Sequence, residues 1–310
     1  MSYLILVAGL IVLLLGGELM VRGAVSIAYR FRVSALVVGM TIVSFGTSAP
    51  ELLVSLQASI DGYPDIAIGN VIGSNIANLA LVLGLTALVL PIEVGKDTLY
   101  LDWPAMMVAT IVTFLFMIDG QIVFYEGCLM FVVLFGYTVF LIRRSRIGRK
   151  EEVVNEDESK LVKSNMLRDV SYIVIGCVGL ALGSDWLVQG AVEISKSFGV
   201  SDLVISVTVV AFGTSAPELM TSLVAAIRKQ SDISIGNLIG SNLFNLFSIL
   251  GVTSMVKSIP INDMILNRDM WWVLGISFII FPMMLLGRRV GRLKGLLLFS
   301  AYILYVLWIF

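Results

Sequence analysis

The sequence predicts an all-α integral membrane protein with ten transmembrane helices, arranged as two inverted-topology five-helix repeats. Three observations predict this class. First, 58% of the 310 residues are hydrophobic and 14% are charged, with a mean hydropathy of +0.97, and a water-soluble domain could not bury so much apolar surface. Second, apolar runs recur along the chain, and at about 20 residues per crossing they leave room for about ten helices. Third, an eight-residue motif occurs twice.

The apolar runs define the expected helices in order. The first run has no basic residue before it, so we expect a retained first span rather than a cleaved signal peptide. The expected spans are residues 3–21, 34–60, 67–90, 102–118, 122–142, 170–190, 201–227, 233–256, 270–287 and 293–310. Cys128 and Cys177 fall within spans, where we expect free core thiols rather than a disulfide or metal ligands. Trp103, Trp271 and Trp272 fit an aromatic belt.

The distribution of Lys and Arg predicts the orientation. If the loop after the first span is cytoplasmic, nearly all basic residues fall on the cytoplasmic side, as the positive-inside rule requires. Those residues are Arg22, Arg30, Arg32, Lys96, the block from Arg143 to Arg168, Arg228, Lys229, Arg288, Arg289, Arg292 and Lys294. Only Lys196, Lys257 and Arg268 would face outward. We therefore expect a multi-pass plasma-membrane protein with both termini extracellular.

The expected domains follow from these spans. Residues 1–142 form the first five-helix repeat, with its motif region at 34–90, and residues 170–310 form the second, with its motif region at 201–256. Residues 143–169 form a charged cytoplasmic linker, in which a basic run precedes an acidic one. We interpret this linker as a solvated hinge rather than a regulatory domain, because it is too short to build a core.

The internal repeat has an offset of 167 residues. The octet from Phe45 to Leu52, Phe-Gly-Thr-Ser-Ala-Pro-Glu-Leu, recurs letter for letter from Phe212 to Leu219. The same offset aligns Gly73-Ser74-Asn75 with Gly240-Ser241-Asn242 without a gap. Each half holds five expected helices, an odd number, so the second half starts from the opposite face of the membrane. Inverted repeats of this kind are typical of secondary transporters with a site near the midplane.

Each octet places a carboxylate near the centre of the membrane. Leu36 to Phe45 would span roughly 15 Å at the helical rise, so Glu51 follows near the middle of a hydrocarbon core about 30 Å thick. Pro50 and Pro217 cannot donate a backbone hydrogen bond, so carbonyl groups upstream of them lose their partners. An ionisable residue at this depth indicates a functional site.

Oxygen atoms gather around these carboxylates at helical spacings of three and four residues, which place them on shared helix faces. They belong to Ser44, Thr47, Ser48, Glu51, Ser74 and Asn78 in the first half, and to Thr214, Ser215, Glu218, Ser241 and Asn245 in the second, with a main-chain oxygen at Ala211. The chain contains no histidine. Donors that are all oxygen favour hard cations such as Ca²⁺ and Na⁺ over zinc or copper, and two carboxylates would balance the charge of one Ca²⁺.

The paired octets, each followed by a Gly-Ser-Asn motif, resemble the two α-repeats of the cation/Ca²⁺ antiporter superfamily, and look closest to prokaryotic Na⁺/Ca²⁺ exchangers. The resemblance covers the whole chain except the linker. It implies antiport of Na⁺ and Ca²⁺ by alternating access, with no organic cofactor, and electrogenic Ca²⁺ export if three Na⁺ replace one Ca²⁺. It also implies that helices two, three, seven and eight form a core across which helices one and six slide. The implied partners are the two ions and the lipid bilayer, without nucleic acid or an obligate protein partner.

The resemblance assigns roles to residues as well. Glu51 and Glu218 would be the Ca²⁺ carboxylates, and main-chain oxygens of Thr47 and Thr214 would complete the central site. The residues that would line flanking Na⁺ sites are Ser44, Ser48, Ser74, Ala211, Ser215 and Ser241. Asn78 and Asn245 would lie at the middle. Aspartate at the second of these two positions is typical of the K⁺-dependent branch, so asparagine favours K⁺ independence.

Other functions stay open at this point. A Ca²⁺/H⁺ antiporter is the main alternative, because a buried glutamate without a compensating cation could take up a proton, although the lack of histidine weakens it. A cation channel is the alternative from another class, since inverted repeats occasionally build channels. A purely structural role for the two glutamates would need an opposing Lys or Arg at their depth, and the sequence offers none. An enzyme is not indicated, because no activated nucleophile, histidine base or catalytic metal set is visible.

Overall fold

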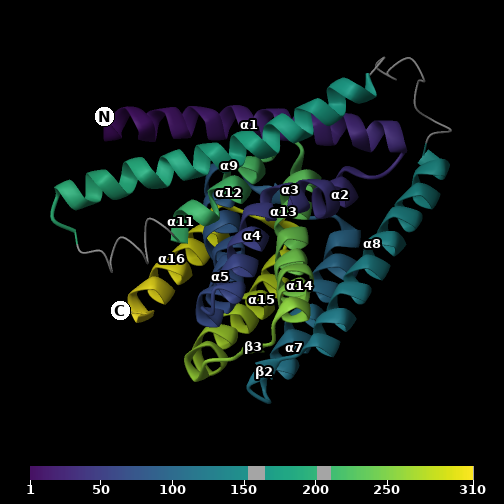
Figure 1. Cartoon of the computed structure of the whole chain (residues 1–310). Helices are drawn as coiled ribbons and strands as arrows, with labels where there is room; N and C mark the ends of the chain where they lie inside the picture. The colour runs from purple at the N-terminus through teal and green to yellow at the C-terminus, as the bar shows by residue number, and fades with distance from the viewer. Residues whose placement is uncertain (153–164, 201–210, 310) are drawn as a thin grey trace.

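The computed structural model describes residues 1–152, 165–200 and 211–309, which form a helical bundle with four short strands (Figure 1). Eight helical segments are long and apolar enough to cross a membrane, and one bent pair of helices raises this to as many as nine. The described chain therefore confirms an all-helical architecture suited to a membrane. The count of ten spans stays a prediction, because residues 201–210 of the seventh expected span lie outside the described residues.

The helices follow the expected spans to within a few residues, except that α1, α8 and α9 are longer. The long helices are α1 (Ser2–Phe31), α7 (Trp103–Met117), α8 (Phe124–Glu152), α9 (Met166–Ser197), α15 (Met270–Leu285) and α16 (Arg292–Ile309). The others are α2 (Ala35–Val38), α3 (Ser44–Thr47), α4 (Ala49–Ile60), α5 (Pro64–Ile76), α6 (Leu83–Val89), α11 (Ala211–Thr214), α12 (Ala216–Ile227), α13 (Ser231–Leu243) and α14 (Leu250–Val256). Because α8 and α9 extend into residues 143–169, both ends of the expected linker are helical.

Several helices continue into π-helical segments. These are η1 (Gly39–Val43), η2 (Ala77–Val82), η3 (Thr98–Asp102), η6 (Phe244–Ile249) and η7 (Ile265–Asp269). The segments η2 and η6 occupy equivalent positions in the two halves, and they carry Asn78 and Asn245. π-Helical turns are rare and occur frequently at functional sites, so this shared distortion marks the two asparagines as special positions.

Four two-residue strands join the two halves of the chain. They are β1 (Ile92–Glu93), β2 (Gln121–Ile122), β3 (Ile259–Pro260) and β4 (Arg289–Val290). Antiparallel pairing connects β1 with β4 and β2 with β3. In the sequence repeat β3 corresponds to β1, and β4 corresponds to β2. The sheet formed by β1 and β4 therefore corresponds to the sheet formed by β3 and β2. In both sheets a strand of the first half pairs with a strand of the second.

Helices α1 and α9 lie side by side and cross the rest of the bundle as a pair (Figure 1). Their contact runs along glycines seven residues apart, which we call the glycine seam: Gly9, Gly16 and Gly23 on α1, and Gly176, Gly183 and Gly190 on α9. A Cβ atom added at Gly16 would lie 2.8 Å from the backbone nitrogen of Leu180, closer than real Cβ atoms come. The seam is thus a backbone-to-backbone contact of the kind that small residues permit between membrane helices.

The middle of the bundle is formed by α5 with α6 and by α13 with α14. In the apolar 18-residue stretch of each of these two segments, 83% and 78% of the residues are buried. The corresponding shares are 17% in α8 and 22% in α9. These two central segments carry the Gly-Ser-Asn motifs, and they pack against the broken helices that carry the octets. The sequence motifs therefore meet in the most enclosed part of the molecule.

Two expectations are wrong: the end of the first span and the place of Trp103 in an aromatic belt. The first span does not end at residue 21, because α1 continues to Phe31 and Arg22 lies within it. The charged residues within α1 are paired, since both Arg22 and Arg228 donate to the Glu18 carboxylate. Trp103 is fully buried, with its indole nitrogen donating to the Ser277 carbonyl at 3.1 Å, so it does not belong to an aromatic belt. Both cysteines are free thiols, as predicted.

We expect Gly16→Leu to lower the stability of the protein, because its side chain would be forced into the backbone of α9. Overpacking of this kind costs about 1–3 kcal/mol. Thermal unfolding of the purified protein in detergent measures the loss. Gly136→Leu is the matched control, since Gly136 is exposed on α8 and an added Cβ there meets nothing within 4 Å. Equal melting temperatures for the two variants would contradict the glycine seam.

Candidate cation site

Each octet forms a helix break followed by a new helix that begins with a glutamate in its first turn. In the first half, Ser48 interrupts the helix with φ −91° and ψ 5°, and the helices on either side are bent by 46°. In the second half, Ser215 does the same with φ −90° and ψ 2°. The proline sits in the first turn of the new helix, where its missing N–H is tolerated. Glu51 and Glu218 consequently lie at helix N-termini, whose partial positive charge favours a carboxylate.

The two carboxylates are both buried, close enough to interact electrostatically. Glu51 is 2% exposed and Glu218 is 0% exposed, and they repel each other electrostatically. The Ser48 hydroxyl of the first break donates to Glu218 Oε1 at 3.0 Å, so the break of one half contacts the acid of the other. Within the described ranges, no Lys or Arg forms an ion pair with either glutamate.

A matched pair of asparagines holds the backbone at each glutamate. The Asn237 side-chain amide donates to the Glu218 carbonyl at 3.4 Å and to the Ser222 hydroxyl at 3.1 Å. In the first half the equivalent amide of Asn70 donates to the Glu51 carbonyl at 3.3 Å and to the Ser55 hydroxyl at 2.9 Å. The sequence analysis gave these asparagines no role. The available signal was that the two asparagines, and the two serines, recur at the 167-residue offset.

The first break is anchored directly on α13. The Ser44 hydroxyl donates to the Gly39 carbonyl at 2.7 Å and lies 3.1 Å from the Asn237 carbonyl oxygen. The Thr47 hydroxyl is within hydrogen-bond reach of the Asn237 side-chain oxygen at 3.2 Å and of the Ser241 hydroxyl at 3.4 Å. Residues predicted for opposite halves of the site are therefore in contact.

Ser184 of α9 supports the second break. Because Pro217 has no N–H, the Gly213 carbonyl lacks its usual helical donor, and the Ser184 hydroxyl donates to this carbonyl instead. The equivalent position of the first half is Gly17, which has no side chain to do the same. The sequence alone does not identify the acceptor of the Ser184 hydroxyl, because that acceptor depends on how α9 packs.

The predicted site residues are almost all buried. Those at most 4% exposed are Ser44, Thr47, Ser48, Glu51, Ser74, Asn78, Ser215, Glu218, Ser241 and Asn245. Thr214 is half-buried, and Ala211 begins α11, while its side chain lies outside the described residues. The Asn245 amide donates to the Asn75 side-chain oxygen at 3.2 Å, across the two halves. Ser74 and Asn78 make no hydrogen bond to the carboxylates in the part of the chain that is described.

Several of these buried oxygens lack a hydrogen-bond partner among the described residues. They are both carboxylate oxygens of Glu51, Oε2 of Glu218, the hydroxyls of Ser74 and Ser215, and the side-chain oxygens of Asn78 and Asn245. Buried polar atoms without partners are destabilising, and carboxylates are the most so. A desolvated hard cation satisfies oxygen atoms of this kind, and each of the predicted ligands offers oxygen. The residues thus fit a hard cation.

Comparison with known proteins identifies the family. A profile of the sodium/calcium exchanger protein family matches residues 1–143 and 169–310. The chain belongs to the sodium/calcium exchanger family. The resemblance predicted from the paired octets is thereby confirmed, and this is a family of multi-pass membrane transporters rather than of enzymes.

Relatives of this family align over nearly the whole chain. The inner membrane protein YrbG of Escherichia coli is 31% identical over 97% of this chain and 94% of its own length. The sodium/calcium exchanger MaX1 of Methanosarcina acetivorans is 30% identical over 100% of this chain and 98% of its own. A solved structure of the sodium-calcium exchanger NCX_Mj has a TM-score of 0.85 at 32% identity, covering 100% of this chain and 99% of that one.

We expect Asn237→Ala to destabilise the exchanger more than Asn70→Ala. Both substitutions leave a backbone carbonyl and a serine hydroxyl without their donor, at a cost of about 1–3 kcal/mol for a buried group. Asn237 is fully buried and also contacts Thr47, whereas Asn70 is only half-buried. Melting temperatures of the two variants in detergent make the comparison, and a larger loss in Asn70→Ala would show that the contact with Thr47 contributes nothing.

Proposed function

We propose that this protein is a secondary antiporter that exchanges Na⁺ for Ca²⁺ at the paired glutamates by alternating access, exporting Ca²⁺ electrogenically. The observation that carries the proposal is the pair of adjacent buried carboxylates, Glu51 and Glu218, without a basic partner among the described residues. One Ca²⁺ neutralises both charges. Membership of the sodium/calcium exchanger family supports Na⁺ rather than H⁺ as the counterion.

The remaining oxygens suit the two ions differently. Ca²⁺ takes six to eight oxygen ligands, which the two glutamates, main-chain oxygens of Thr47 and Thr214, and water can supply together. The neutral hydroxyls and amide oxygens around them provide oxygen without charge, as Na⁺ requires. Their positions are Ser44, Ser48, Ser74, Ser215, Ser241, Asn78 and Asn245, and Ala211 adds a main-chain oxygen. If three Na⁺ replace one Ca²⁺, one net charge crosses the membrane in each cycle.

The proposed architecture is two inverted five-helix repeats, residues 1–142 and 170–310, joined by a cytoplasmic linker at 143–169. The counterpart sheets β1–β4 and β2–β3 support a two-fold relation between the repeats, as does the antiparallel glycine seam. The distribution of Lys and Arg supports a plasma-membrane protein with both termini outside. In this arrangement α1 and α9 are the first helices of the two repeats, and their joint movement across the central helices alternates access to the site.

We expect Glu51→Gln and Glu218→Gln each to abolish Na⁺-driven Ca²⁺ uptake into proteoliposomes while the protein stays folded. Each removes one of the two charges that balance Ca²⁺, and neutralising a buried charge adds no new desolvation cost. Uptake of ⁴⁵Ca²⁺ and a melting curve on the same preparations measure the two effects. Glu193→Gln, an exposed glutamate on α9, is the matched control and should transport normally. Wild-type uptake by either site variant would remove that glutamate from the site.

We expect Asn245→Asp to change ion preference rather than abolish transport, because it adds a charge beside the proposed cations without removing a ligand. Ca²⁺ uptake measured with and without K⁺, across a range of Na⁺ concentrations, would report the change. Asn165→Asp is the control, since Asn165 is an exposed helix cap. An ion profile unchanged from wild type would mean that position 245 does not touch the ions.

The proposed exchange is tested most simply by the gradient that drives it. Proteoliposomes loaded with Na⁺ and diluted into Na⁺-free medium should take up ⁴⁵Ca²⁺. If three Na⁺ leave for each Ca²⁺ that enters, one net positive charge leaves in each cycle, so an inside-positive potential should accelerate the uptake. Slower uptake at an inside-positive potential would mean that net positive charge enters with Ca²⁺. Uptake driven only by an acid-inside pH gradient would identify a Ca²⁺/H⁺ antiporter, and uptake without any countergradient would identify a channel.

A further inference from the structure

The pair of helices α1 and α9 is attached unequally to the two broken helices. Both α1 and α9 pack against α12, and neither packs against α4 to a comparable extent. A Cβ atom added at Gly17 of α1 would lie 3.3 Å from the Met220 carbonyl oxygen of α12 and 3.4 Å from a methyl carbon of Val224. In the sequence repeat, the contact of α1 with α12 corresponds to a contact of α9 with α4. The described residues form the first of these contacts far more extensively than the second.

The exposure of equivalent residues shows the same difference. On α12, Thr221 is 0% exposed and Val224 is 7% exposed. Their counterparts on α4 are Val54, which is 46% exposed, and Gln57, which is also exposed. Because Val54, Gln57 and Asp61 are three and four residues apart, they share one face of α4. This face is uncovered, whereas the equivalent face of α12 is covered by α1.

An ion pair fastens α1 to the end of the covered face. Arg228 is the C-cap of α12, and its guanidinium donates to both carboxylate oxygens of Glu18 on α1, with Nε 3.0 Å from Oε2. Arg22, one turn further along α1, donates to the same carboxylate. A bidentate pair of arginine and carboxylate has a defined geometry. The Glu18–Arg228 pair therefore specifies how α1 lies on α12.

The equivalent positions of the other half carry two acids. Glu18 corresponds to Asp185 on α9, and Arg228 corresponds to Asp61, the C-cap of α4. Each of these aspartates accepts a hydrogen bond at 2.9 Å from a glutamine of its own helix. If α9 packed against α4 as α1 packs against α12, the two aspartates would meet as Glu18 and Arg228 do now. Because like charges repel, that arrangement would be opposed rather than stabilised.

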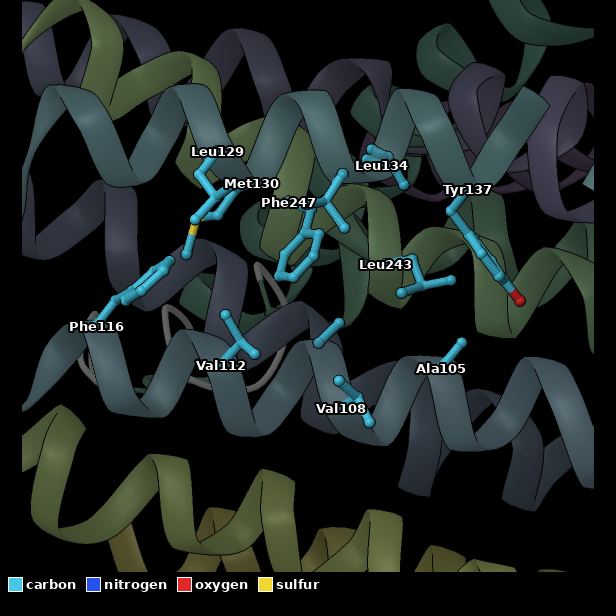
Figure 2. Close-up of a pocket in the computed structure, with 12 residues that line it drawn as sticks. Ala105, Val108, Val112, Phe116, Leu129, Met130, Leu134, Tyr137, Leu243 and Phe247 are labelled. Carbon is cyan, nitrogen blue, oxygen red and sulfur yellow. The ribbon is translucent and has the colours of Figure 1, made fainter. Parts of the chain in front are cut away.

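The helices on which this pair lies are fastened to one another. Figure 2 shows the hollow between α7 and α8, and Tyr137 at one end of it donates to Asp102 Oδ1 at 2.9 Å. The Arg144 guanidinium of α8 donates to Asp97 Oδ1, also at 2.9 Å. The sheets β1–β4 and β2–β3 join the two halves. Since α1 and α9 contribute no residue to these contacts, the two helices can move across the others without breaking them.

We propose that the Glu18–Arg228 pair is a latch that favours the access state of this structure, and that Asp61 and Asp185 disfavour the opposite state. The inference rests on the proposed function, in which joint movement of α1 and α9 alternates access. In the proposed orientation the Glu18–Arg228 pair lies at the cytoplasmic side, and the two aspartates lie at the extracellular side. The latch thus closes the cytoplasmic side, and the exchanger rests with its site facing outward.

The test compares the reactivity of two cysteine probes towards a charged, water-soluble maleimide. It uses the full-length protein in detergent at one fixed Na⁺ concentration, with the native Cys128 and Cys177 replaced by alanine. One probe is Gln57→Cys on α4, and the other is Val224→Cys at the equivalent position of α12. We expect the first to react quickly and the second slowly, because only the α4 face is uncovered in this state.

Two substitutions should move both probes towards the opposite state. Arg228→Asp removes the latch, and Asp61→Arg allows α4 to pair with Asp185 of α9. Each should slow the Gln57→Cys probe and accelerate the Val224→Cys probe, by several-fold at most because exposed ion pairs are weak. Unfolding would instead accelerate both probes. Local charge also opposes the expected changes, since a nearby arginine favours the reactive thiolate and a nearby aspartate disfavours it.

The matched control is Lys229→Asp, which changes the charge of the exposed residue next to Arg228 by the same amount. Its probe rates should equal those of the parent protein, and Arg228→Lys should also stay close to them. Equal rates in Arg228→Asp and Lys229→Asp, or a change of both probes in one direction, would overturn the latch. The probes report the position of α1 and α9 without ion transport. Failure of the latch is therefore distinguished from failure of the exchange, which ⁴⁵Ca²⁺ uptake measures.

Discussion

Two carboxylates, Glu51 and Glu218, are buried within electrostatic reach of each other, and no basic residue among the described residues is paired with either. Such a pair is tolerated at depth only if something compensates its charge. The surrounding features follow from that need. Each glutamate lies in the first turn of the helix that follows a break. Asn70 and Asn237 donate to the main-chain carbonyls of the glutamates, and Ser48 of the first half donates to Glu218 of the second. In the proposed function, a cation bound between the two glutamates completes this compensation.

Much of this arrangement could be predicted from the sequence because the two halves of the chain can be aligned with each other. Identity of the octets at one offset singled out Glu51 and Glu218, and the prolines predicted where the helices break. Contacts between distant spans could not be predicted in the same way. The bond from Ser184 to the Gly213 carbonyl and the reach of Thr47 to α13 depend on packing rather than on local spacing. The length of α1 was underestimated for a similar reason. Glu18 and Arg22 are charged and so indicated the end of a span, whereas in the structure Arg228, from a distant helix, is bonded to Glu18.

The two halves share a plan, but they differ at positions that matter. Ser44 of the first half has Ala211 as its counterpart, and Gly17 has Ser184. The first break is therefore anchored on α13 through hydroxyls, whereas the second receives a hydroxyl from α9. The two broken helices are therefore supported differently, although the scaffold around them is duplicated.

In the proposed exchange, Ca²⁺ and Na⁺ compete for one set of oxygens between the halves. Equilibrium binding of ⁴⁵Ca²⁺ to the purified exchanger in detergent, repeated across a Na⁺ titration with choline replacing Na⁺ at constant ionic strength, measures this competition. Saturating Na⁺ should displace all specifically bound Ca²⁺, with a steep dependence on Na⁺ concentration because more than one Na⁺ takes its place. Ca²⁺ that stays bound at saturating Na⁺, with undiminished affinity, would mean that the two ions occupy separate sites and do not compete.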